Sequence, residues 1–367
     1  MERVKFELET LFVEEASRAS PLVTRIVSRL PAGVDVRYVA DGRSVALPLG
    51  AVADPFGTGK RRMVLLRRRG SFLMGCPAGS TDFACCGYLV MVLASNCPMD
   101  CSYCFLQEYV ADNPGLQIYV NYADVFDELD RVSADSNGRA LRIGTGELAD
   151  SLAFDSLTGM ARDLVEYFSR RENLLLELKT KTDDIDGLLG IDPRGRTLVS
   201  WTLSPAHVHM NSEHRTASPA VRIDAARRVL AAGYKVAFHL DPLIVYDGAE
   251  QDYARLLENL FDFIPSEQIG FISLGGLRMT PRLRAIARAR FPRDRLLLGE
   301  EVLAADGRYR AIAPLRFRLY SRLREQIARA NPRLPVYLCM ETAGAHQRVF
   351  GDVPATPAAL GARLAGV

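Results

Sequence analysis

Apolar residues follow two alternating patterns along most of the chain. Short apolar runs, which are typical of buried strands, are followed by segments whose apolar residues recur every three or four positions, as on one face of a helix. The strand-like runs occupy residues 88–95, 140–147, 174–182, 198–204, 235–244 and 269–277. The helix-like segments occupy residues 123–135, 156–171, 183–190, 218–234, 252–264 and 280–291. Repeated strand–helix units predict a parallel sheet whose strands are joined by right-handed crossovers.

About six such units fit between residues 87 and 295, which favours an α/β fold. Periodicity alone does not choose between a partial TIM-like barrel and a doubly wound sheet. Residues 1–80 predict a small N-terminal α/β domain, because a helix-like segment lies there between two strand-like runs. Residues 301–367 predict a C-terminal extension that contains a hairpin, a helix and a strand. The central domain is therefore expected to span residues 81–300.

Composition narrows the class of protein. The chain has 367 residues, of which 48% are apolar and 25% are charged, with a net charge of +2. These values exclude a disordered, collagen-like or strongly polycationic chain. No apolar run is long enough to span a membrane, and the charged N-terminus does not resemble a secretory signal. We therefore expect a cytoplasmic protein without a membrane partner.

Six of the seven cysteines lie between residues 76 and 104. Cys97, Cys101 and Cys104 form a C-x3-C-x2-C motif directly after an apolar strand. Three such close thiolates cannot all pair as disulfides, so their spacing indicates metal or redox chemistry. A structural zinc site normally has four protein ligands, and no second CxxC pair follows. An iron–sulfur cluster held by three thiolates would instead leave one iron open to a ligand.

The other cysteines and the basic runs keep two interpretations each. Cys76, Cys85 and Cys86 are expected either to be small buried residues or to form a second metal or redox site with Cys339. The basic runs at residues 60–62 and 67–69 are expected either to face solvent or to contact phosphates.

The motif with Tyr103 before its last cysteine resembles that of the radical S-adenosylmethionine (SAM) superfamily. The resemblance implies a [4Fe-4S] cluster on Cys97, Cys101 and Cys104, whose open iron binds SAM. It also implies that an electron from the cluster cleaves SAM to a 5′-deoxyadenosyl radical, which removes a hydrogen atom from the substrate. Such an enzyme needs a reducing partner, of the flavodoxin or ferredoxin kind.

The segment CSYCFLQ resembles the spore photoproduct lyase family more narrowly. Similar stretches are LFVEE, PLVTRIVSRL, YVNYADVFDEL, LKTKTDDIDGLL, RIDAARRVLAAGYKVAFHLDPL and DGRYR. The resemblance implies a partial (β/α)6 TIM-like barrel and a lyase that repairs a thymine-dimer photoproduct in DNA. It also implies that DGRYR lies in a hairpin that engages the lesion. Damaged DNA or another nucleotide is therefore the expected substrate.

Two positions depart from the family pattern. The family carries a cysteine hydrogen donor where this chain has Glu147, within GELAD, and a tyrosine where it has Phe105. Gly146-Glu147 resembles the GE motif of radical SAM enzymes, whose glutamate accepts a hydrogen bond from the ammonium group of SAM. These changes keep open a radical SAM enzyme with a small-molecule, RNA or peptide substrate. A cluster-containing nucleic-acid-binding or redox protein without catalysis also stays open.

The remaining candidate residues lie at strand ends, where barrel enzymes bind their ligands. Tyr103 is expected to pack beside the adenine of SAM, and Lys181 to contact its carboxylate. Cys339 is expected to be a relocated hydrogen donor, since S–H bonds are weak. The other candidates for cofactor binding are Ser200, Thr202, Ser204 and His239. Each also has a purely structural interpretation as a core or surface residue.

Overall fold

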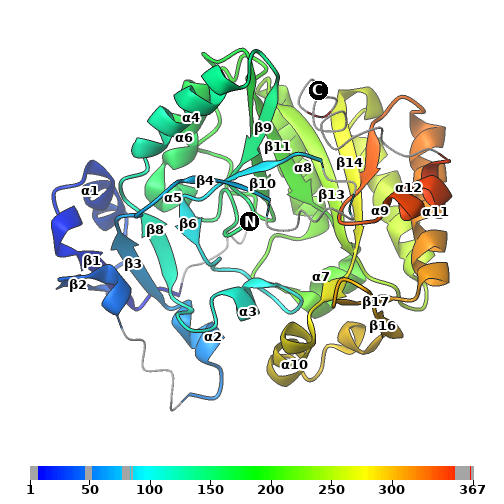
Figure 1. Ribbon diagram of the computed structural model, residues 1–367, viewed down its shortest axis with the longest axis horizontal. Helices are drawn as coiled ribbons and strands as arrows, with labels where there is room; N and C mark the ends of the chain where they lie inside the picture. Colours follow the sequence, from blue (N-terminus) through cyan, green and yellow to red (C-terminus); the bar gives the residue numbers. More distant parts are fainter. Residues whose placement is uncertain (1–6, 46–51, 77–82, 84–85, 352–363, 365–367) are drawn as a thin grey trace.

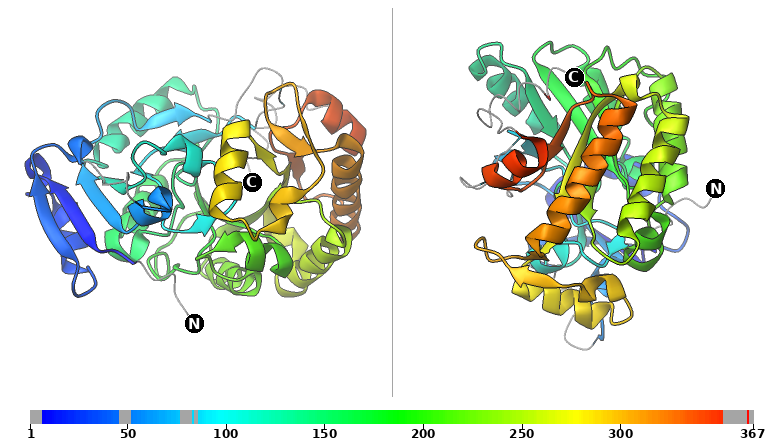
Figure 2. Two further views of the ribbon diagram at one scale, coloured as in Figure 1. Left: turned by 90° about the horizontal axis from the view of Figure 1, so that it is seen from below. Right: turned by 90° about the vertical axis from the view of Figure 1, so that its right-hand side faces the viewer.

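The computed structural model describes residues 7–45, 52–76, 83, 86–351 and 364 (Figure 1). Two sheets organise these residues, and helices cover their outer faces. Figure 2 shows the N-terminal sheet and helix α11 (Ala313–Ala330) at opposite ends of the molecule, with the larger sheet between them. No helix in the described ranges is both long and apolar enough to cross a membrane.

The first sheet contains five strands in the order β2-β1-β3-β8-β6. Its strands are β1 (Thr10–Glu14), β2 (Asp35–Val39), β3 (Arg62–Leu66), β6 (Ala94–Ser95) and β8 (Leu116–Tyr119). All neighbours are parallel except β6 and β8. Its helices are α1 (Pro21–Ser28), α2 (Pro55–Gly59) and α4 (Asp124–Asp135). Because β6 and β8 come from beyond residue 80, the sheet does not end at the expected domain boundary.

The second sheet contains eight strands in the order β18-β14-β13-β11-β10-β9-β5-β4. They are β4 (Leu73–Gly75), β5 (Leu89–Met91), β9 (Leu141–Gly144), β10 (Leu174–Thr180), β11 (Thr197–Thr202), β13 (Lys235–Leu243), β14 (Ile269–Gly276) and β18 (Val336–Leu338). Only β4 is antiparallel to its neighbour. The sheet curls into an open barrel, which confirms the expected partial TIM-like fold (Figure 1).

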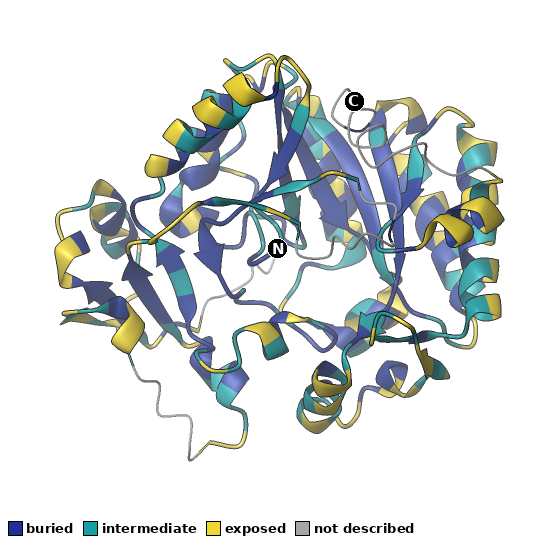
Figure 3. Cartoon of the chain, in the orientation of Figure 1, coloured by how far each residue is buried: buried dark blue, intermediate teal, exposed yellow. Residues whose placement is uncertain are grey.

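Helices follow most barrel strands, and the helices that flank the sheet turn their buried residues toward it (Figure 3). The helices of this part of the chain are α3 (Leu106–Tyr109), α5 (Asp155–Thr158), α6 (Met160–Phe168), α7 (Ala206–Ser212), α8 (Pro219–Ala231), α9 (Ala249–Phe263), α10 (Pro281–Arg290) and α12 (Ala343–Phe350). Helix α8 shows which residues determine where a helix begins and ends. The Ser218 hydroxyl caps its first turn, and Gly233 follows its end with φ of +90°.

Short elements complete the architecture. The two-stranded pair is β7 (Asp100–Cys101) with β12 (Glu213–His214). The three-stranded sheet is β15 (Arg278–Met279), β16 (Glu301–Leu303) and β17 (Tyr309–Ala311). The 3-10 helices are η1 (Glu15–Ser17), η2 (Gly42–Ser44), η3 (Ser266–Gln268) and η4 (Arg295–Leu298). The hairpin of β16 and β17 therefore occupies the position that the DGRYR segment predicts.

Two helix predictions were wrong in detail. Residues 183–190 form turns rather than a helix, because three aspartates and two glycines in eight residues favour turns. The segment expected as one helix over 156–171 is divided into α5 and α6 by Gly159, whose φ is +61°. This positive φ ends the first helix and lets the chain begin a second one.

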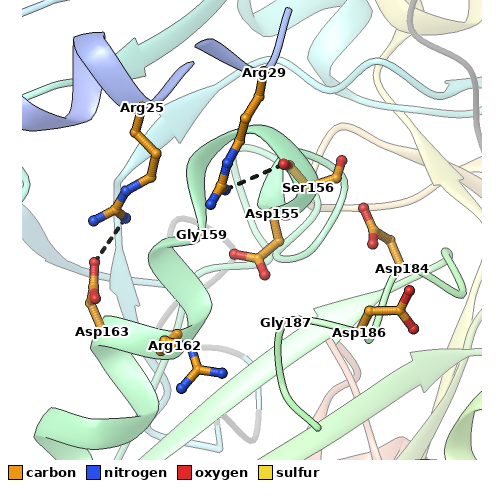
Figure 4. A pocket seen from close by; sticks show the side chains of 10 residues that line it. All are labelled: Arg25, Arg29, Asp155, Ser156, Gly159, Arg162, Asp163, Asp184, Asp186 and Gly187. Carbon is orange, nitrogen blue, oxygen red and sulfur yellow. Dashed lines mark hydrogen bonds and ion pairs between the residues drawn. The ribbon is translucent and has the colours of Figure 1, made fainter. Parts of the chain in front are cut away.

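A hollow of about 540 Å³ marks the junction between the N-terminal unit and the barrel (Figure 4). Arg25 on α1 donates from Nη1 to the Thr158 carbonyl at 2.8 Å and to the Asp163 carboxylate at 3.2 Å. Arg29 donates to the Ser156 carbonyl at 3.4 Å. These cations therefore bind carbonyls at the C-terminal end of α5, where the helix dipole favours positive charge.

Candidate active site

A cavity of about 690 Å³ opens at the carboxyl ends of the barrel strands. Its charged and thiol-bearing walls come from most of these strands, with Glu147 after β9, Lys179 on β10, Asp241 on β13, Arg278 after β14 and Cys339 after β18. Residues at this end of parallel barrel strands converge on one space, which is where such folds bind their ligands. The cavity is therefore the candidate active site.

The three motif cysteines, Cys97, Cys101 and Cys104, all line this cavity. Asn96 turns the chain into the loop with φ of +66°, and its side-chain oxygen accepts a hydrogen bond from the Cys97 amide at 2.8 Å. At the end of the loop, the Cys104 amide donates to the Cys101 carbonyl at 3.1 Å. We call residues 97–104 the cysteine loop, and its three cysteines share the wall of the cavity.

Buried charges from distant segments hold the cysteine loop in place. Lys60 donates to the Asp100 carboxylate at 3.0 Å and also to the Met99 carbonyl. Arg290, on α10, donates to the same Asp100 carboxylate at 3.1 Å and to Asp54 at 2.8 Å. Lys60 is 5% exposed, so this residue of the first basic run neither faces solvent nor is available to phosphates. It is instead an internal support of the loop.

A second set of contacts fixes the other side of the cysteine loop. The Tyr103 hydroxyl donates to Glu213, which also forms a buried ion pair with Arg222 at 2.6 Å. Burial opposes ionisation of Glu213, but Arg222 holds the pKa of its carboxyl at about 2. The Ser102 hydroxyl donates to Asp294 at 2.5 Å. The Tyr103 side chain is therefore fixed by its hydroxyl while its ring faces the cavity.

The chemistry of the cysteine loop fits an iron–sulfur cluster. Burial raises the pKa of the Cys97 thiol to about 12, and it also raises the pKa of Cys101 and Cys104. Such thiols become thiolates when a metal displaces their protons. Among the described residues, no three His, Cys, Asp or Glu side chains converge as ligands of a single metal ion. A cluster instead offers each thiolate a separate iron atom.

A buried polar network forms the floor of the cavity. Glu177 accepts hydrogen bonds from Arg142 at 2.8 Å, Ser200 at 2.7 Å and His239 at 2.8 Å. Burial opposes ionisation of Glu177, but Arg142 and His239 hold the pKa of its carboxyl well below the ordinary value. Burial and nearby Lys179 lower the pKa of His239 to about 4, so its imidazole is neutral near pH 7. Its Nε2–H therefore donates to the carboxylate.

Four further charges lie on the cavity wall. Arg278 binds Asp241 through two bonds of 2.9 and 3.1 Å, which hold the pKa of Asp241 low despite its burial. Burial raises the pKa of Glu147, and the nearby Lys179 ammonium opposes that rise. Within the described part of the chain, no hydrogen-bond donor is seated on the Glu147 carboxylate. Glu147 is therefore an acceptor that is open to a cationic ligand.

Cys339 places a thiol against this charged wall. Its Sγ lies 4.0 Å from Nη2 of Arg278. Burial, and then the Asp241 carboxylate, raise the pKa of the Cys339 thiol well above its ordinary value. The thiol therefore keeps its hydrogen at neutral pH, as a hydrogen-atom donor must.

The structure brings most of the candidate residues together. The cavity is lined by Tyr103, Glu147, Lys181, Thr202, His239, Cys339 and the three loop cysteines. Ser200 and Ser204 are fully buried, and their hydroxyls bind Glu177 and Glu213 rather than facing the cavity. Cys85 lies outside the described residues.

Several cavity residues carry no signal in the sequence. Arg142 and Glu177 lie within apolar strands and meet only because β9 pairs with β10. Tyr88 also lines the cavity, with a buried hydroxyl that has no hydrogen-bond partner in the described ranges. A Cβ at Gly144 would lie 1.9 Å from this hydroxyl, so glycine makes room for it. Lys179 lies two residues before Lys181, and side chains at this spacing along an extended chain share one face.

Comparisons with known proteins agree with this geometry. The sequence profile of a family described as spore photoproduct lyase matches residues 7–314. A spore photoproduct lyase of Clostridium acetobutylicum is 24% identical over 269 residues, which cover 73% of this chain and 77% of the relative. The enzyme of Bacillus subtilis is 27% identical over 210 residues, which cover 57% of this chain and 61% of the relative. The aligned part thus spans less than two thirds of the B. subtilis protein.

Solved structures show the same fold. A spore photoproduct lyase complexed with dinucleoside spore photoproduct matches with a TM-score of 0.80 and 22% identity, covering 91% of this chain and 99% of the other. A variant with bound AdoMet and dinucleoside spore photoproduct also matches with a TM-score of 0.80 and 22% identity, covering 90% of this chain and 99% of the other.

Proposed function

Since this chain belongs to the spore photoproduct lyase family, we propose that it is a radical SAM enzyme that repairs a thymine photoproduct in DNA. One observation carries the proposal: three cysteines with the radical SAM spacing share a cavity with an open carboxylate and a protonated thiol. The solved relatives with bound AdoMet and dinucleoside photoproduct support the same cofactor and a DNA-like substrate.

The residues on the cavity wall suit SAM. Cys97, Cys101 and Cys104 would hold a [4Fe-4S] cluster, which with SAM supplies a carbon radical that removes hydrogen from the substrate. Glu147 accepts a hydrogen bond from an ammonium group, because its carboxylate is open and partly desolvated. Lys181 contributes a cation for a carboxylate.

Other residues orient the cofactor and exclude water. The Tyr103 ring offers a fixed apolar surface for adenine, because Glu213 holds its hydroxyl. Thr202, at the end of β11, and His239, in the middle of β13, add polar contacts to the cavity. Ser200 and Ser204 take a positioning role, since each donates to a buried carboxylate beneath the cavity.

Cys339 is the proposed hydrogen donor. The family cysteine is replaced by Glu147, and Cys339 brings a protonated thiol to the same cavity. A substrate radical would take the hydrogen of this S–H bond and leave a sulfur-centred radical. Arg278 and Asp241 position the thiol from one side.

A different substrate is the second candidate. Glu147 replaces the family donor, and Phe105, 38% exposed, replaces a tyrosine and packs edge to face on Tyr109. Both changes lie on the cavity. They favour an enzyme that uses the same cluster and SAM on a small molecule, RNA or peptide.

Oxygen-free reconstitution tests both candidates. The reconstituted protein is reduced with dithionite and given SAM, with or without dinucleoside spore photoproduct, and 5′-deoxyadenosine and repaired dinucleotide are measured by chromatography. We expect a cluster signal in electron paramagnetic resonance that changes with SAM, 5′-deoxyadenosine and repaired product. 5′-Deoxyadenosine without repair would favour the second candidate. A cluster without SAM cleavage would reject both candidates and leave a non-catalytic cluster protein.

A further inference from the structure

The open barrel has a seam at which the segments beside its two ends meet. Strand β18 is at one end of the sheet order, and β5 is next to the other end. Phe83, upstream of β5, forms an isolated antiparallel bridge with Thr342, downstream of β18. The seam is thus closed by contacts between residues that are far apart in the sequence.

This bridge brings together the two segments that carry Cys86 and Cys339. Cys86 lies three residues after Phe83, and Cys339 lies three residues before Thr342. Both cysteines therefore lie close along the chain to the point where the seam is closed. A disulfide between them requires Cα atoms about 4.4–6.8 Å apart.

Independent observations place the two thiols together. Cys86 and Cys339 line the same cavity. They also pack against the same apolar cluster, which includes Phe271 and Tyr337. Each of Tyr337 and Cys339 interacts electrostatically with Cys86. The position of the bridge and the shared surroundings therefore agree.

Arg310, from the hairpin, holds both sides of the seam. Its guanidinium lies 5.6 Å from the centre of the Phe83 ring and donates to the Met340 carbonyl at 3.3 Å. Met340 follows Cys339 and has φ of +54°, an uncommon conformation for a residue with a long side chain. The backbone beside Cys339 is therefore held in a fixed and unusual position.

We propose that Cys86 and Cys339 form a reversible redox pair across the seam, which a small disulfide such as oxidised glutathione converts to a disulfide bond. In the reaction, the two protein thiols lose two hydrogens and become one disulfide. The small disulfide is reduced to two thiols, so electrons and protons balance. The consequence for repair rests on the proposed function, since the disulfide removes the hydrogen of Cys339.

Peptide mapping tests the pair directly. Reconstituted protein is incubated without oxygen in glutathione redox buffers, its remaining thiols are alkylated, and it is digested with chymotrypsin. Cleavage after Phe83 and Tyr88 separates Cys86 from the cysteine loop. We expect a peptide linked between residues 84–88 and the segment that contains Cys339. Absence of that linked peptide in the most oxidising buffer would overturn the proposal.

Matched variants identify the partner. Cys85→Ser should keep the linked peptide, whereas Cys86→Ser and Cys339→Ser should lose it. A link that persists in Cys86→Ser but disappears in Cys85→Ser would overturn the assignment. Circular dichroism of each variant separates loss of the link from loss of folding.

Repair measured in the same buffers separates this inference from the proposed function. A buffer about 30 mV above the midpoint potential leaves about a tenth of the pair reduced, so repair should fall about tenfold and recover with dithiothreitol. Cys86→Ser should keep its repair under those conditions. A linked peptide with unchanged repair would support the redox pair and contradict the donor role of Cys339.

Discussion

Two hollows of the molecule differ in how their most buried carboxyl groups are held. In the cavity of about 690 Å³, the carboxylates of Glu177 and Asp241 are bound by arginines that hold their pKa values low. In the junction hollow of about 540 Å³, Asp155 is 6% exposed, and burial raises the pKa of its carboxyl to about 6 (Figure 4). Arginines thus keep Glu177 and Asp241 ionised in fixed positions in the cavity, whereas burial opposes ionisation of Asp155 in the junction hollow.

The difference separates a candidate reaction chamber from a joint. The cavity combines fixed charges with thiols and an apolar wall, as chemistry shielded from water requires. The junction hollow contains arginines that bind backbone carbonyls of α5 and so connect α1 to the barrel. Buried charges alone therefore do not mark an active site. The groups that the charges contact, thiols in the cavity and backbone carbonyls in the junction hollow, distinguish the two.

The largest expected effect comes from removing a loop cysteine. Cys101→Ala should abolish 5′-deoxyadenosine formation and lower the bound iron, because a cluster needs its thiolate ligands. Iron analysis and electron paramagnetic resonance measure the loss. Cys76→Ala, at the same cavity, is the matched control and should keep the cluster. An unchanged cluster signal in Cys101→Ala would contradict the assignment of the cavity, rather than the junction hollow, as the site of the cluster.

The next effect tests the support beneath the cavity. Arg222→Met should lower the free energy of unfolding by about 3–5 kcal/mol, because Glu213 would be left as a buried, unpaired charge. Urea unfolding measures the change. Arg228→Met, on the same helix, removes a partly exposed ion pair with Asp186 and should cost at most about 1 kcal/mol. Equal losses of unfolding free energy in the two variants would show that burial of the ion pair does not determine how much its removal destabilises the protein.

A smaller effect tests the close packing of the cavity wall. Gly144→Ala should cost about 1–3 kcal/mol of unfolding free energy, because its Cβ would meet the Tyr88 hydroxyl. Gly75→Ala, where an added Cβ meets nothing within 4 Å, is the control and should change stability little. Adding Tyr88→Phe to Gly144→Ala should recover part of the loss. No recovery would contradict the assigned contact.

The smallest effect concerns the junction hollow and its dependence on pH. The pKa of Asp155 rises from 3.8 to about 6 on folding, so its protonated form stabilises the fold and that contribution is lost as pH rises through about 6. Asp155→Asn should therefore raise stability above pH 6 by about 1–3 kcal/mol, and its amide oxygen can still accept from Ala161. Thermal unfolding from pH 4 to pH 8 measures this.

Asp130 is the control for this prediction, because its pKa is shifted in the opposite direction to that of Asp155. Tyr167 and Arg171 bind Asp130 and lower its pKa, so its contribution to stability is present at neutral pH and is lost as pH falls. Asp130→Asn should therefore leave the protein less stable at neutral pH than the native chain. A pH profile unaltered by Asp155→Asn would contradict the assigned burial.

The sequence predicts the parts of the site that lie close together in the chain. Cys97, Cys101 and Cys104 follow one another within eight residues, and their spacing indicates a cluster directly. Lys60 and Arg290 could not be found in this way, because 230 residues separate the two side chains that meet at Asp100. Contacts of this kind depend on strand order, which periodicity does not fix.

Residues of the buried network show the same limit. Ser200 lies on β11 and Ser204 lies two residues after its end, but the sequence does not say that buried carboxylates lie beside them. Residues 183–190 show a different error. Their apolar spacing suggested a helix, but their aspartates and glycines favour turns, which the structure shows.

The most direct measurement follows the hydrogen that the repaired product receives. The reconstituted enzyme repairs dinucleoside spore photoproduct in D₂O, where the Cys339 thiol exchanges its hydrogen for deuterium, and mass spectrometry counts the deuterium in the product. We expect solvent deuterium in the product of the native chain, and loss of normal repair in Cys339→Ala with 5′-deoxyadenosine formation retained. Unchanged repair and deuterium content in Cys339→Ala would contradict the assignment of this cavity thiol as the donor.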